Sequence, residues 1–113
     1  MNWSKKKNKY SAKKVKIDGM TFDSELEYRR WVQLRHMESA GLITHLERQK
    51  RYPFNELTYP GTGRSPYYVA DFHYYDVEKK TWVAEDKKGV MTDVFRLKWA
   101  LMKYFYDMEV LIT

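Results

Sequence analysis

Two short runs of aromatic and β-branched residues constrain the fold of this chain more than any other feature. Residues 67–72 read YYVADF, and residues 82–89 read WVAEDKKG. Both compositions are typical of short β-strands. The intervening residues 76–80, DVEKK, are polar and indicate a turn. The two runs therefore predict neighbouring strands, joined as a hairpin, around which the rest of the chain is organised.

Acidic side chains lie at the edge of both apolar runs. In the first strand, Asp71 shares a face with Tyr67 and Val69, because alternate residues of a strand point to the same side. We expect that face to be buried, so Asp71 interrupts an apolar pattern. Polar interruptions of this kind are often functional, although an acid near the end of a strand can also simply reach water.

The second strand carries two overlapping acid-x-Lys pairs. Glu85 is followed by Lys87, and Asp86 is followed by Lys88. Each pair presents a carboxylate and an ammonium on one face. Periodicity alone leaves open which of the two pairs faces Asp71. The pair on the other face is then expected to be a solvent-exposed ion pair, which contributes little to stability.

Two carboxylates beside a lysine have a characteristic chemistry. They suit a hard divalent cation that polarises a water molecule. The histidines, His36, His45 and His73, are scattered and do not have the spacing of a zinc site. The residues therefore favour a small metal-dependent nuclease built around the central hairpin.

Composition narrows the class of partner and of chemistry. The 113 residues have the size of one domain, with a formal net charge of +6 and a pI near 9.4. Such a positive field favours a polyanionic partner, most often nucleic acid. The absence of cysteine excludes disulfides, cysteine-ligated zinc and thiol catalysis. Because no apolar run approaches a membrane span and no signal-peptide core is present, we expect a cytoplasmic protein without a membrane partner.

Basic residues outside the central hairpin are candidate phosphate contacts. Residues 1–14 are rich in lysine, contain no acid and predict a basic flexible arm that includes Lys13 and Lys14. Residues 15–113 then form a single domain. Arg64, in a loop rich in glycine and proline, and Lys98, in a predicted helix, are further candidates. A solvated tail, a plain loop and a solvated helix face are the simpler alternatives.

Turn and capping signals predict the remaining elements. Asp18 and Gly19 favour the two-residue turn of a small N-terminal hairpin. Ser24, followed three residues later by Glu27, forms a capping box at the start of a helix that Gly41 ends. Glu27 is explained as a cap, but in the first helical turn its carboxylate can also face the strand ends.

The expected order is a hairpin, a helix, three strands, a helix and a strand. Besides the central hairpin, the elements are a small hairpin over 15–22, a helix from 24 to about 40, a strand over 42–54, a loop over 55–66, a second helix from 92 or 93 to 106, and a strand over 108–113. Helical spacing assigns packing contacts to Leu26, Trp31, Leu34 and Met37 in the first helix, and to Val94, Leu97, Leu101, Met102 and Phe105 in the second.

In this order and spacing, the motifs resemble the PD-(D/E)XK nuclease superfamily, in particular small endonucleases of phages and prophages in the group that includes Holliday-junction resolvases. The resemblance spans residue 15 to the C-terminus. One departure is Ala70, where the superfamily name expects proline before the acid. The residues that carry the resemblance are Ser24-x-x-Glu27, Gln49, Tyr68-Val69-Ala70-Asp71-Phe72, Glu85-Asp86-Lys87-Lys88-Gly89 and Lys98.

The resemblance implies a restriction-endonuclease-like αβββαβ core of the α/β class, with a mixed central sheet flanked by two helices. In that family the catalytic lysine commonly precedes the glycine after the strand, which selects Lys88 with Asp86 as its acid. Glu27 then resembles the helical carboxylate that joins Asp71 and Asp86 in metal binding, and Gln49 resembles a site-adjacent amide that helps to contact nucleic acid. Glu85 with Lys87 stays an alternative.

The expected function is therefore Mg²⁺-dependent DNA cleavage, with Mn²⁺ as a substitute. It would take place in the host cytoplasm if the chain is phage-encoded, and would serve recombination or DNA processing. A branched substrate would imply a homodimer. Two other functions stay open: a non-catalytic nucleic-acid-binding module on the same fold, and a protein-interaction domain whose aromatic residues form an interface.

Overall fold

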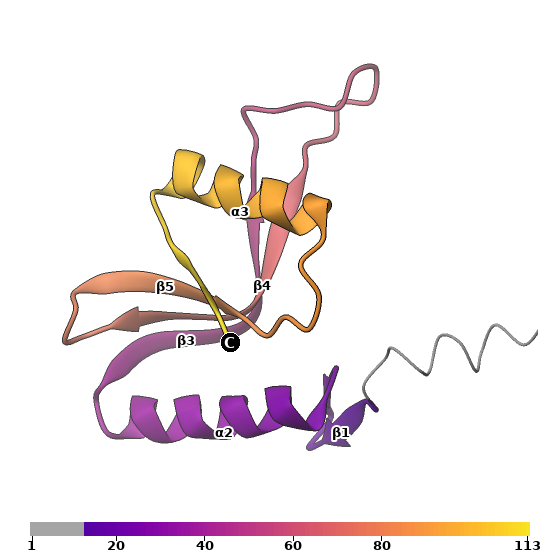
Figure 1. The fold of residues 1–113 in the computed structure, drawn as a ribbon. Coiled ribbons are helices and arrows are strands. Elements are labelled where there is room, and N and C mark those ends of the chain that lie inside the picture. Colours follow the sequence, from indigo (N-terminus) through magenta and orange to yellow (C-terminus); the bar gives the residue numbers. More distant parts are fainter. Residues whose placement is uncertain (1–12) are drawn as a thin grey trace, which may run out of the picture.

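A computed structural model describes residues 13–113, which form two helices, a two-stranded hairpin and a four-stranded sheet. Residues 1–12 of the predicted arm lie outside the described residues. The mixed α/β class and the N-terminal hairpin predicted from sequence are confirmed (Figure 1). In chain order the elements are β1 (Val15–Ile17), β2 (Met20–Phe22), α2 (Glu25–Ser39), β3 (Ile43–Pro53), β4 (Tyr67–Asp76), β5 (Thr81–Asp86), α3 (Asp93–Tyr106) and β6 (Val110–Ile112).

The larger sheet has the strand order β3-β4-β5-β6. Its first two pairs are antiparallel, and β6 runs parallel to β5. The parallel pair requires a crossover, which α3 supplies. Figure 1 shows α2 on one side of this sheet and α3 on the other. The predicted mixed sheet flanked by two helices is therefore present.

Each helix covers its own apolar cluster. Under α2, Leu34 packs with Ile43, Phe72 and Tyr74 of the sheet. Under α3, the buried side chains Phe95 and Met102 pack with strand residues that include Tyr68, Ala70, Ala84 and Val110. The sheet is thus buried on both faces, as expected for an α/β domain.

The helix ends agree with the capping signals. The Ser24 hydroxyl accepts a hydrogen bond of 3.1 Å from the Glu27 amide, and Gly41 has φ +79° directly after the C-cap. A left-handed residue at this position lets the following amides bond back to helix carbonyls, and Leu42 N–H donates to the Met37 carbonyl in this way.

The packing predicted for three helical residues is wrong. Leu26, Val94 and Leu97 are 57%, 64% and 61% exposed. The apolar stripe that packs on the sheet is therefore narrower than helical spacing indicated, and in α3 its buried members are Phe95 and Met102. Leu26 instead lines a cavity described below.

The face of β4 that carries Asp71 is also more open than predicted. Tyr67 and Val69 keep 39% and 36% of their surface exposed, whereas Tyr68 and Ala70 are buried. The prediction that Asp71 interrupts a buried face is therefore wrong. The buried residues in this half of the strand are those of the opposite face.

On either side of Asp71, residues of β4 two positions apart pack into different apolar clusters. Ala70 packs in the cluster under α3, whereas Phe72 packs in the cluster under α2. Residues two apart in a regular strand share a face, so the strand must turn about its axis here. On β3, Gln49 has φ +53° and is left out of the ladder at the position opposite Asp71. Such irregularities redirect a side chain, and they are common beside active sites.

Candidate active site

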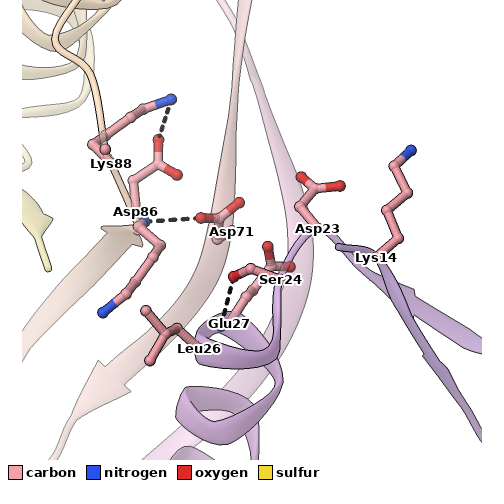
Figure 2. Close-up of a pocket in the computed structure, with 10 residues that line it drawn as sticks. Lys14, Asp23, Ser24, Leu26, Glu27, Asp71, Asp86 and Lys88 are labelled. Carbon is pink, nitrogen blue, oxygen red and sulfur yellow. Dashed lines mark hydrogen bonds and ion pairs between the residues drawn. The ribbon is translucent and has the colours of Figure 1, made fainter. Parts of the chain in front are cut away.

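A cavity of about 570 Å³, which we call the acidic cavity, lies where β4, the end of β5 and the start of α2 meet. Glu27, Asp71, Asp86 and Lys88, which the sequence predicted as one site, all line this cavity, together with Lys14 (Figure 2). Three segments far apart in the chain therefore bring carboxylates and an ammonium to a common space.

Strand register brings the two central carboxylates together. Phe72 pairs with Glu85 across the antiparallel β4–β5 ladder, so Asp71 and Asp86 are the next residues facing each other. Asp86 ends β5, whereas Asp71 lies in the middle of β4. Beyond the end of β5, the Lys87 backbone N–H donates a hydrogen bond of 2.8 Å to Asp71 Oδ2. The orientation of Asp71 is thus fixed by the Lys87 backbone amide, which lies just beyond the end of β5.

Asp86 is held by a hydroxyl and an ammonium. The Tyr68 hydroxyl donates a hydrogen bond of 2.7 Å to Asp86 Oδ2, and Lys88 Nζ lies 3.3 Å from the same oxygen. Lys88 Nζ also lies 4.5 Å from the centroid of the Phe95 ring. Because Asp86 is only 2% exposed, these contacts define its orientation with little competition from water. Burial and the Asp86 carboxylate raise the pKa of Tyr68 well above its usual range, so Tyr68 stays a donor.

The surroundings of Asp71 favour its protonated form near neutral pH. Burial raises the pKa of Asp71 to about 8, and a hydrogen bond with the Asp86 side chain adds to this effect. The Lys87 amide opposes the shift, and the charges of Asp86 and Glu27 reinforce it. Two carboxylates this close cannot both ionise easily, so a proton or a cation must offset their charge.

Glu27 faces the cavity from the first turn of α2. It is 2% exposed, and its Oε1 accepts no hydrogen bond within residues 13–113. Arg48 Nη2 lies 3.8 Å from that oxygen. Burial, and then the charge of Asp23, raise the pKa of Glu27. The Ser24 half of the predicted capping box is present, but Glu27 keeps a buried oxygen without a partner, which is unusual for a group with only a capping role.

Of the alternative pair, Lys87 lines the cavity and Glu85 does not. Glu85 is fully buried under α2, where it accepts hydrogen bonds from Arg30 Nε at 2.5 Å, Arg30 Nη2 at 3.1 Å and the Tyr74 hydroxyl at 2.8 Å. These bonds occupy both of its oxygens. Of the two acid-x-Lys pairs, only Asp86 with Lys88 lies in the cavity with both members.

The cavity is not a complete metal site formed by side chains alone. Within the described part of the chain, no three His, Asp or Glu side chains converge closely enough to hold a metal ion. The donor set nevertheless suits a hard cation, because it offers two mutually repelling carboxylates and one buried carboxylate oxygen without a partner. Such an ion would need backbone oxygens and water to complete its coordination.

The remaining predicted residues divide into three groups. Lys13 is exposed, and Lys14 lines the acidic cavity. Lys98 and Arg64 line a second cavity. Gln49 is exposed and lines neither of the two, although it lies opposite Asp71 in the sheet. Sequence reasoning missed Tyr68, because nothing in the sequence indicates that its hydroxyl reaches a carboxylate on the next strand.

The raised pKa of Asp71 makes the stability of the metal-free protein depend on pH. The pKa of Asp71 is about 8 in the folded state, well above the 3.8 of a free aspartate, so folding favours its protonated form. The contribution of Asp71 to stability is therefore fully present below about pH 4 and is lost progressively as pH rises toward about 8. Between about pH 5 and about pH 9, the free energy of unfolding of Asp71→Asn should rise by about 2 kcal/mol relative to that of the native chain. The full shift would give about 4 kcal/mol, and solvent screening reduces it because Asp71 is only half-buried.

Urea unfolding in the presence of EDTA measures this difference. Asp93→Asn is the matched control, because the Asp93 side chain is fully exposed and its variant should show no such dependence on pH. If the advantage of Asp71→Asn is the same at both pH values, the pKa of Asp71 is not raised in the folded protein.

The fold and the cavity define a mixed α/β domain with an acidic pocket at one end of its sheet. The chain belongs to the family described as "Protein of unknown function (DUF1064)", whose model matches residues 7–112. No curated protein and no solved structure matches the chain. Within residues 13–113, no helix has the length and apolar character needed to cross a membrane.

Proposed function

We propose that the protein is a Mg²⁺-dependent endonuclease that hydrolyses phosphodiester bonds of DNA on a restriction-endonuclease-like core. The observation that carries this proposal is the joint position of Asp71, Asp86 and Lys88 in one cavity of a strongly basic chain. Carboxylates with one lysine form the minimum set for a metal-assisted hydrolysis of phosphodiesters.

The oxygen ligands of the proposed ion come from three segments. Asp71 and Asp86 would bind it directly, the Lys87 carbonyl would add a backbone oxygen, and Glu27 would bind directly or through water. When bound, Mg²⁺ offsets the carboxylate charge, polarises the phosphate and lowers the pKa of a coordinated water. Mn²⁺ prefers similar ligands and is the expected substitute.

Residues of the chain orient the reacting groups. The Tyr68 hydroxyl and the Lys87 amide keep the Asp86 and Asp71 carboxylates directed into the cavity. The Lys88 ammonium, 3.3 Å from Asp86, would orient the attacking water and stabilise the negative charge that grows on the phosphate oxygens. Because these groups are held before substrate binds, little reorganisation is needed in the transition state.

The proposed DNA contacts rest on charge. The net charge of +6 supports attraction to a polyanion, and Lys14 lies at the cavity itself. Lys13, Lys98 and Arg64 would add contacts to phosphates that carry no sequence information. A structure-selective role in recombination or DNA processing is part of the proposal, and a branched substrate would need two such sites, hence a homodimer.

A cleavage assay on a panel of labelled DNAs tests the proposal. Linear, nicked, single-stranded and branched substrates are incubated with Mg²⁺ or with EDTA. We expect at least one substrate to be cut with Mg²⁺ and none to be cut with EDTA. Asp71→Asn should lose this activity, because it removes a ligand, and Asp93→Asn should keep it. Cleavage that persists in Asp71→Asn would contradict the assignment of the site.

One observation favours a second candidate, a non-catalytic nucleic-acid-binding module. Within residues 13–113, no three acidic or histidine side chains are arranged to hold a metal ion without help from backbone and water. Binding of DNA without cleavage in either Mg²⁺ or Mn²⁺, and without any effect of these ions on thermal stability, would support this module instead.

A further inference from the structure

A second cavity, of about 440 Å³, which we call the basic cavity, lies between the loop after β3, the start of β4 and α3. Three cations line it, Arg51, Arg64 and Lys98, together with two aromatic residues, Tyr59 and Tyr67. No acidic residue is among its described lining residues. The cavity therefore combines a positive field with aromatic surface, which are the two features that proteins use to bind nucleotides.

Two of the three cations, Arg51 and Lys98, contact an aromatic ring without being neutralised. The Arg51 guanidinium lies 3.7 Å from the centroid of the Tyr67 ring, and Lys98 Nζ lies 5.8 Å from the same centroid. Within the described residues, none of Arg51, Arg64 and Lys98 forms an ion pair with a carboxylate. A cation–π contact orients a charge but leaves it available to an anion.

The loop that carries Tyr59 is built before any ligand binds. Tyr59 N–H donates a hydrogen bond of 2.8 Å to the Arg64 carbonyl, and the Arg64 amide donates one of 3.1 Å to the Thr62 hydroxyl. These bonds close the loop on itself. Tyr59 is 50% exposed and lines the cavity, so its aromatic ring is accessible to a ligand beside the three cations.

A smaller hollow of about 240 Å³ connects the basic cavity with the acidic one. It is lined by both Lys88 and Lys98. Lys88 also lines the acidic cavity, and Lys98 also lines the basic cavity. A strand whose phosphate lies at Lys88 can therefore continue to Lys98 without crossing an acidic residue of the hollow.

We propose that the basic cavity binds one unpaired nucleotide of the DNA strand whose phosphate lies in the acidic cavity. Arg51, Arg64 and Lys98 bind its phosphate, and its base stacks on Tyr59. A base inside a cavity cannot remain paired in a duplex. The substrate class is therefore DNA with a single-stranded segment beside the cleaved bond. The assignment of the bound strand as a substrate rests on the proposed nuclease function.

Binding in the absence of metal tests the nucleotide site without depending on cleavage. Fluorescence anisotropy compares a short oligothymidylate with a duplex of equal length, in EDTA and with the full chain. Tyr59→Ala should weaken binding of the single strand about tenfold and change duplex binding less than about twofold, because stacking on one base is lost. Tyr59→Phe should bind normally. Tyr104→Ala is the matched control, since Tyr104 is 81% exposed and does not line the cavity.

The salt dependence of binding tests the phosphate contacts. Arg64→Gln combined with Lys98→Gln should flatten the plot of log affinity against log salt by about 0.7 for the single strand, the value for one lost phosphate contact, because the two cations bind the same phosphate. Lys79→Gln combined with Lys80→Gln removes the same charge from the turn between β4 and β5, and should leave the slope closer to the native value.

The outcomes separate this inference from the proposed function. Equal losses of single-strand and duplex affinity in Tyr59→Ala, or no loss at all, would overturn the nucleotide site whatever the nuclease assay gives. A selective loss in Tyr59→Ala, in a chain that cleaves no DNA with Mg²⁺ or Mn²⁺, would support the nucleotide site and overturn the nuclease.

Discussion

Replacing Lys88 with alanine is expected to lower Mg²⁺-dependent DNA cleavage by about 10²–10³-fold, whereas Lys87→Ala should retain most of the activity. Lys88 Nζ lies 3.3 Å from Asp86 Oδ2 inside the acidic cavity, so its charge is next to the proposed reacting phosphate. Lys87 supports Asp71 through its backbone N–H, and alanine keeps that amide. The two substitutions remove the same charge from neighbouring positions, so the difference between them reports position and not net charge.

Single-turnover cleavage at saturating protein measures this effect without a contribution from binding. Lys88→Arg should recover part of the rate, because it restores a cation at the cavity but not the point charge of an ammonium. DNA affinity should fall by a similar small factor in both alanine variants. Equal rates for Lys87→Ala and Lys88→Ala would contradict the role of Lys88. A loss confined to Lys87→Ala would favour the other acid-x-Lys pair.

Much of the fold could be predicted because its signals are local. Asp18 and Gly19 both adopt the positive φ that their turn requires, and Ser24 and Gly41 begin and end α2 where expected. Such signals depend on a few neighbouring residues, so a sequence contains them completely. The mixed sheet flanked by two helices, by contrast, was an implication of the family resemblance and not of local signals.

The faces of the central strands could not be predicted in the same way. Two-residue alternation treats β4 as regular, but the strand turns around Asp71, where Gln49 of the neighbouring strand adopts a positive φ. This irregularity arises between strands that are far apart in sequence. For the same reason, alternation left open whether Asp86 or Glu85 faces Asp71.

The candidate site was predictable as a set of residue types but not as an arrangement. The spacing of Ser24 and Glu27 indicated a helix cap, and the unpartnered carboxylate oxygen of Glu27 appears only once α2 is packed beside the sheet. The bond from Tyr68 to Asp86 is likewise a tertiary contact. Residues that support a site from another strand leave no signal in a single sequence.

The second large effect concerns the ion pair between Arg30 of α2 and Glu85 of β5, which we expect to be essential for the stability of the fold. Arg30→Ala should lower the free energy of unfolding by about 3–5 kcal/mol, because it leaves the fully buried Glu85 without its cation. Arg29→Ala is the matched control on the same helix. Arg29 pairs with Glu25 at 2.8 Å, but both side chains are about two-thirds exposed, so its loss should change stability by less than about 1 kcal/mol.

Urea unfolding measures the stability of both variants, and an unchanged m-value shows that the comparison is valid. A double variant separates the structural role of Glu85 from a role in catalysis. Arg30→Met with Glu85→Met should recover most of the stability lost in Arg30→Ala, because a buried ion pair can be replaced by apolar side chains of similar volume. If Glu85 serves only the fold, this double variant should also cleave DNA at a rate near that of the native chain. A stable double variant without cleavage would mean that Glu85 acts in the reaction. Carboxylates of both acid-x-Lys pairs, Glu85 and Asp86, would then act in the same reaction.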